Sequence, residues 1–82
     1  MYKKIDEYFS WFNKPAVVVE KHDGEFIGFY WTWLKWKETS HSQLESFYGA
    51  DNDLDRLKLS KEEFIIRFGS FRLRLLNSKL DI

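Results

Sequence analysis

Apolar side chains near the start of the chain recur at the spacing of a helix. Positions i, i+3, i+4 and i+7 lie on one face of an α-helix, and here they hold Ile5, Tyr8, Phe9 and Phe12. Asn13 and Pro15 end the pattern, because proline disfavours helical backbone at the residue before it. We therefore predict an amphipathic helix over residues 2–13.

The next segment carries β-branched and aromatic runs on both sides of Asp23-Gly24, a pair suited to a two-residue turn. That turn predicts a hairpin in which Val18 faces Phe29. One face would carry Ala16, Val18, Ile27, Phe29, Trp31 and Trp33, and the other Val17, Val19, Phe26, Gly28, Tyr30 and Thr32. A solvent-facing antiparallel strand normally alternates with polar residues, but both faces here are apolar. Either the protein covers both faces, or a partner covers one.

A short helix is predicted over residues 41–48. Ser40 and Gln43 have the spacing of a capping box, and Gly49 suits the C-terminal cap. Its apolar stripe would hold Leu44, Phe47 and Tyr48. The acidic run at 51–56 is predicted to form a loop or a single helical turn.

The segment 61–75 fits two structures. Ser60 and Glu63 form a second capping-box signature, which allows a helix that ends at Gly69. A strand instead places Phe64, Ile66 and Phe68 on one face, and the sequence favours this strand. Gly69-Ser70 would then turn the chain into a further strand, with Phe71, Leu73 and Leu75 opposite. The other face would show Glu63, Arg67, Arg72 and Arg74.

These elements predict one domain, residues 1–82, of the α+β class. An N-terminal helix would pack on a four-stranded antiparallel sheet made of two hairpins, with a short helix in the crossover. A chain of 82 residues has a thin core, and its 8 Phe, 4 Tyr and 4 Trp supply large apolar side chains to fill it.

Charge and composition narrow the classes of function. Lys plus Arg and Asp plus Glu both total 13, so no global basic field attracts nucleic acid. Cysteine is absent, which fits a reducing compartment. The N-terminal residues do not resemble a secretory signal, and the apolar stretch 26–34 is shorter than the ~20 residues a membrane helix needs. We expect a cytoplasmic protein without membrane contact.

Candidate catalytic and metal-binding groups are few. His22 and His41 have no cysteine or second histidine at metal-ligand spacing. Asp51, Asp53, Asp55 and Glu62 match the acidic positions of a calcium loop, but Arg56 stands where its sharp turn requires glycine. We therefore expect no enzyme activity, no cofactor and no metal site.

The predicted binding surface combines aromatic rings with cations on one face of the sheet. In the predicted register Arg67 and Arg72 lie opposite each other, and like charges so placed repel unless an anion lies between them. The acceptor would be a partner's carboxylate or phosphate, or an internal acid such as Glu63. We expect Tyr30 and Trp36 to be exposed. The full set is Tyr30, Lys35, Trp36, Lys37, Arg67, Arg72 and Arg74.

The sequence therefore predicts a protein-binding module, an inhibitor or regulator that occludes a partner surface. The analogy is with small phage or mobile-element proteins that block host factors, and it is an analogy of class only. One alternative is single-stranded nucleic-acid binding, with rings stacking on bases and cations contacting phosphates. Another is that the surface joins two copies in a homodimer.

Overall fold

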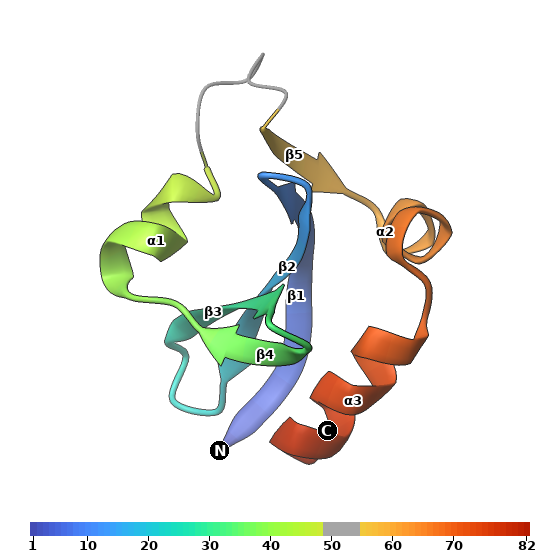
Figure 1. Cartoon of the computed structure of the whole chain (residues 1–82). Coiled ribbons are helices and arrows are strands. Elements are labelled where there is room, and N and C mark those ends of the chain that lie inside the picture. The colour runs from blue at the N-terminus through green and yellow to red at the C-terminus, as the bar shows by residue number, and fades with distance from the viewer. Residues whose placement is uncertain (49–54) are drawn as a thin grey trace.

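The computed structural model describes residues 1–48 and 55–82, which form a three-layer α+β fold. A five-stranded antiparallel sheet, in the order β4-β3-β2-β1-β5, lies between α1 on one face and α2 and α3 on the other (Figure 1). The elements are β1 (Tyr2–Trp11), β2 (Lys14–Lys21), β3 (Phe26–Thr32), β4 (Lys35–Glu38), α1 (His41–Ser46), β5 (Arg56–Leu59), α2 (Lys61–Phe68) and α3 (Phe71–Leu80). The predicted four-stranded sheet beneath an N-terminal helix is therefore wrong.

The N-terminal segment is strand β1 and not a helix. Tyr2, Ile5 and Tyr8 all pack against the same core cluster, although they stand three positions apart. The pairing with β2 shifts between Tyr2 and Lys4, and again between Ile5 and Glu7. Each shift adds one residue to β1, as a β-bulge does. The two bulges therefore give a strand the i, i+3 spacing that we read as a helix.

The hairpin of β2 and β3 is present, but its register differs by one residue from the prediction. Val18 pairs with Gly28 and Val17 with Phe29. The connection is longer than two residues: the Gly24 N–H donates to the Lys21 carbonyl at 3.0 Å, and Gly24 has φ +88°. A turn that ends in a left-handed glycine bulge adds this residue. A shift of one moves every side chain of β3 to the other face relative to β2.

Two buried clusters fill the space on the two faces of the sheet. The cluster beneath α2 and α3 consists of Val17, Val19, Phe29, Trp36, Phe64, Leu73, Leu76 and Leu80. The cluster beneath α1 consists of Phe9, Trp11, Ala16, Val18, Tyr30 and Phe47. Hence the protein itself covers both apolar faces of the β2–β3 hairpin.

Helix α1 confirms the predicted helix at 41–48 in position and start. Ser40 and Gln43 form the expected capping box, with the Gln43 N–H donating to the Ser40 hydroxyl at 3.2 Å. The helix approaches β3 closely at Gly28, where an added Cβ would lie 3.1 Å from Cε2 of Phe47. Glycine in β3 thus permits the contact between α1 and the sheet.

Residues 61–80 form two helices, so the favoured strands are wrong and the helical alternative for 61–68 is confirmed. Ser60 and Glu63 make both hydrogen bonds of a capping box at the start of α2. Gly69 caps its end with φ +83°. In α3, Leu73, Leu76 and Leu80 are buried at helical spacing. Two helices can bury these leucines against the sheet, whereas a strand could not place all three on one face.

Strand β5 pairs with β1, although the sequence predicted a loop or turn up to residue 56. The predicted cap at Gly49 and the acids Asp51 and Asp53 lie outside the described residues. Within 1–48 and 55–82, no helix is long and apolar enough to cross a membrane.

Candidate functional site

Tyr30 and Trp36, which we expected to be exposed, are 7% and 3% accessible, so that expectation is wrong. The Tyr30 ring packs edge-on against Trp11 at 5.1 Å beneath α1. Trp36 packs on the other face, where its Nε1–H donates to the Arg72 carbonyl at 2.6 Å. Both rings belong to the core and are unavailable for stacking on a ligand.

The five predicted cations lie on both sides of the sheet. Lys35 and Lys37 are exposed on β4, and they point away from the face that holds Trp36, because successive side chains of a strand alternate. The three arginines, Arg67, Arg72 and Arg74, belong to α2 and α3 on the face of Trp36. The seven predicted residues therefore do not form one surface.

Arg72 is satisfied in part by an internal acceptor of a kind we did not predict. Its Nη1 donates to the Phe68 carbonyl at 2.7 Å, and its guanidinium lies 5.3 Å from the Trp31 ring centroid. Its Nε is buried, and no described residue forms a hydrogen bond with it. Arg67 and Arg72 stand on two different helices and do not face each other across a hairpin, so that expectation is also wrong.

The most exposed large apolar side chains of the described internal residues stand together at the β3–β4 turn. Trp33 is 89% and Leu34 is 88% accessible. Thr32 pairs with Lys35, so these two residues alone connect the strands. Their φ angles are +53° and +63°, as in a type I′ turn. Such turns favour Asn and Gly, and a bulky residue there is an outlier.

A second turn in the protein has the same geometry but a different environment. Phe12 and Asn13 connect β1 and β2 with φ +50° and +61°. The Phe12 ring packs on Trp11 at 5.4 Å and on the Arg56 guanidinium at 5.1 Å. These contacts offset the strain at Phe12. Among the described residues Trp33 makes no such ring contact, so packing does not explain its conformation.

The base of the β3–β4 turn is anchored to the rest of the fold. Trp31 and Trp36 form a cross-strand pair with ring centroids 5.7 Å apart, one residue below the turn. Helix α3 forms two hydrogen bonds with Trp36. The Trp36 indole N–H donates to the Arg72 carbonyl, and Lys79 Nζ donates to the Trp36 carbonyl at 3.2 Å. We call Trp33 and Leu34 the tip. The tip therefore projects from a base that contacts α3.

Positive charge surrounds the tip. Lys35 follows it directly and Lys37 lies two residues further along β4. Within the described parts of the chain, neither lysine forms an ion pair or a side-chain hydrogen bond. The Arg72 guanidinium lies on Trp31 on the opposite face. The tip is therefore an apolar projection with cations at its base.

The sequence held a signal for this turn that we missed. Trp31 and Trp36 stand at an odd spacing, which would place them on opposite faces of a single strand. A two-residue turn at 33–34 makes them direct neighbours across a hairpin, as observed. Aromatic pairs across strands stabilise such hairpins. We missed the turn because Trp-Leu is not a turn sequence.

The remaining titratable groups form local contacts. His41 lies 2.9 Å from Glu45 one helical turn away, and both are exposed. The Tyr48 hydroxyl donates to Glu7 at 2.9 Å, and burial together with this carboxylate raises the pKa of Tyr48. Across 1–48 and 55–82, no three His, Cys, Asp or Glu side chains gather where they could hold a metal ion.

Compared with known proteins, the chain matches no family model, no curated protein and no solved structure.

Proposed function

We propose that the protein is a binding module that inserts Trp33 and Leu34 into an apolar pocket with an acidic rim on a partner protein. The observation that supports this proposal is the exposure of both side chains, 89% and 88%, in strained left-handed backbone without internal packing. Strained residues that the fold does not require are a reason to infer function.

The tip can supply most of the energy of a modest complex. Full burial of one large apolar side chain stabilises by about 1.5–3 kcal/mol, so the two together contribute about 3–6 kcal/mol. Tryptophan is enriched among the residues that dominate binding energy at protein interfaces. The anchored base reduces the entropy lost when the tip is fixed in a pocket.

The lysines beside the tip favour an acidic rim. Lys35 and Lys37 have no carboxylate partner within the described residues, so a complementary negative charge on the partner would speed association and select the correct partner. Net charge cannot provide this steering, because the chain as a whole has a formal charge of zero. The recognition that we propose is local to β4 and the tip.

A protein pocket suits this geometry better than nucleic acid or lipid. Tyr30 and Trp36, the two rings that we expected to stack on bases, are buried, and the tip presents one indole beside an aliphatic side chain, whereas single-stranded nucleic acid is bound by several rings on which successive bases stack. Binding to a fluid bilayer is strengthened little by a fixed turn, whereas the affinity for a shaped pocket rises when each side chain is held in one orientation. By filling a pocket on its partner, the module would act as an inhibitor or regulator.

The test is quantitative affinity capture from a cell lysate with three baits. These are the wild type, the tip variant Trp33→Asn/Leu34→Gly, and Ile66→Gln as a matched control, because Ile66 is an 85% accessible apolar side chain on α2. The Asn-Gly pair keeps the turn, because both residues accept its backbone. We expect at least one protein to be depleted tenfold or more with the tip variant and retained with the control. Identical captures for the tip variant and the wild type would overturn the proposal.

Two further measurements test other binding targets of the tip. Solution mass is followed over a dilution series, and a dimer that the tip variant abolishes would assign the tip to a second copy. Co-sedimentation with anionic vesicles is measured for the wild type and the tip variant, and binding that requires the tip would assign it to a lipid surface. Either result would overturn a partner protein as the target.

A further inference from the structure

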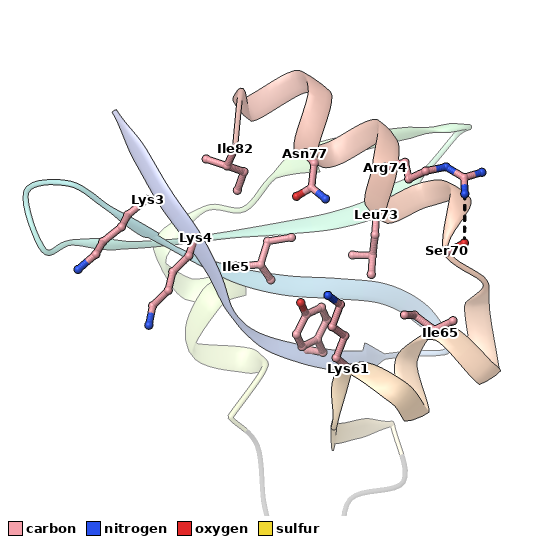
Figure 2. Close-up of a pocket in the computed structure, with 11 residues that line it drawn as sticks. Lys3, Lys4, Ile5, Lys61, Ile65, Ser70, Leu73, Arg74, Asn77 and Ile82 are labelled. Atoms are coloured by element: carbon pink, nitrogen blue, oxygen red, sulfur yellow. Dashed lines mark hydrogen bonds between the residues drawn. The ribbon is translucent and has the colours of Figure 1, made fainter.

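A second surface of the protein, distinct from the tip, is a cleft between β1 and the two C-terminal helices. The cleft has a volume of about 450 Å³. Figure 2 shows the residues that line it, which come from β1, α2 and α3 and the ends of the helices. Its apolar wall includes Ile5, Ile65 and Leu73. Small-molecule sites are clefts of this kind and size, with an apolar lining and a few polar groups.

The side chains that line the cleft and can donate hydrogen bonds include Tyr8 on β1, Lys61 on α2 and Asn77 on α3. None of the three makes a side-chain hydrogen bond or an ion pair within residues 1–48 and 55–82. Burial, together with the charge of Glu62, raises the pKa of Tyr8, so its phenol stays protonated as a donor at neutral pH. The cleft therefore holds several donors without an internal acceptor.

Basic side chains predominate along the cleft. Lys3, Lys4, Lys61 and Arg74 line it, and none of the described residues that line it is an Asp or a Glu, although Glu62 stands near enough to Tyr8 to act on its pKa. Lys3 lies 3.9 Å from Glu20, and Arg74 contacts the Ser70 hydroxyl at 3.4 Å. In Figure 2 the Lys61 amino group is directed into the cleft, while Lys3 and Lys4 project away from it. A concave apolar wall concentrates such a positive field.

We propose that this cleft binds a small amphipathic anion, whose carboxylate or phosphate is held by Lys61, Tyr8 and Asn77 while its apolar chain lies on Ile5, Ile65 and Leu73. Lys61 provides the main ionic contact, because its amino group is directed into the cleft. Lys4 and Arg74 strengthen the field at the rim. These residues are separate from the tip, so this inference and the proposed function can fail independently.

The test compares four ligands by calorimetry and by amide chemical shifts of the ¹⁵N-labelled full chain. Decanoate and monodecyl phosphate carry the anion and the chain, decyltrimethylammonium carries the chain with opposite charge, and acetate carries the charge alone. We expect saturable binding of one or both anionic amphiphiles, at least tenfold tighter than of the other two probes. The shifts should be largest at amides around the cleft, among them Ile5, Leu73 and Asn77. The two anionic probes separate a carboxylate ligand from a phosphate ligand.

Two charge reversals complete the test. Lys61→Glu should weaken binding of the anionic amphiphile at least tenfold, and Lys37→Glu, an exposed residue of β4 outside the cleft, should change it less than twofold. Circular dichroism confirms that both variants fold. Equal binding of decanoate and decyltrimethylammonium, an unchanged affinity in Lys61→Glu, or shifts that map elsewhere would each overturn the inference. The absence of saturable binding of both anionic amphiphiles at millimolar concentration would also overturn it.

Discussion

The strained tip makes a prediction about stability whose sign distinguishes a structural role from a binding role. The perturbation is the double substitution Trp33→Asn/Leu34→Gly. Both side chains are nearly fully exposed, 89% and 88%, so their removal forfeits little buried area. Both residues have positive φ, which Asn and Gly adopt at lower cost. We therefore expect the variant to be more stable than the wild type.

The magnitude follows from two opposing terms. A non-glycine residue in left-handed backbone costs roughly 1–2 kcal/mol, so relief at Trp33 and Leu34 amounts to about 2–4 kcal/mol at most. The glycine introduced at 34 makes the unfolded chain more flexible, which costs about 0.4–1 kcal/mol. The net gain is roughly 1–3 kcal/mol. For a chain of this length each 1 kcal/mol raises Tm by about 4–8 °C.

The assay is urea denaturation and thermal unfolding, both followed by circular dichroism. Trp36→Ala is the matched comparison, because Trp36 is 3% accessible and its truncation should cost about 3–5 kcal/mol. The tip variant should unfold at higher urea concentration with an unchanged m-value. A loss of more than about 1 kcal/mol in the tip variant would show that Trp33 and Leu34 pack internally, and would refute the reasoning.

Three further predictions concern the fold. Gly28→Ala should destabilise by about 1–3 kcal/mol in urea unfolding, because the added Cβ would lie 2.8 Å from the Thr39 hydroxyl oxygen and 3.0 Å from Leu44 of α1; an unchanged midpoint would contradict this packing. Ser60→Ala should cost about 1 kcal/mol through the lost capping box, and Ser60→Gly only a few tenths, since glycine is a tolerated cap. The pKa of Tyr48 is raised in the folded protein, so its neutral phenol contributes to the free energy of unfolding; this contribution is present below pH ~10 and is lost as the pH rises through the folded pKa. Tyr48→Phe should reduce the loss of stability at alkaline pH in unfolding titrations, and an equal loss in the wild type and the variant would exclude the contact with Glu7.

Part of the fold could be predicted because local chemistry decided it. The capping box of Ser40 and Gln43 places the start of α1 correctly. The apolar runs around Asp23-Gly24 identify the β2–β3 hairpin, although a three-residue connection shifts its register. These signals depend on residues close in sequence, so they can be interpreted correctly without knowledge of tertiary contacts.

Other elements depend on contacts that the sequence does not display. The spacing of Ile5 and Tyr8 is helical, and only pairing with β2 reveals that the bulge between Ile5 and Glu7 produces it. The segment 61–68 has both a capping box and a strand pattern, and packing of Phe64 against the sheet selects the helix. Amphipathic periodicity cannot arbitrate between such alternatives over eight residues.

The predicted site failed for a related reason. We placed Trp33 on an apolar face of the predicted hairpin and Trp36 at the surface, because we predicted no turn at 33–34. The turn at 33–34 reverses both assignments. A sequence that contradicts its local backbone preference is expected at functional sites, where local consistency is sacrificed. The odd spacing of Trp31 and Trp36 was the one sequence signal that we identify for the turn, and the backbone angles and exposure of Trp33 and Leu34 identify the tip itself.

The most direct measurement of the central claim is the affinity of one captured partner, purified, for the wild type and for the tip variant Trp33→Asn/Leu34→Gly. The variant should lose about 3 kcal/mol of binding free energy that burial of the tip supplies, which corresponds to binding roughly a hundredfold weaker. Ile66→Gln, at an exposed apolar residue of α2, should bind as the wild type does. Equal affinities for the wild type and the tip variant, with the partner bound elsewhere, would contradict the account.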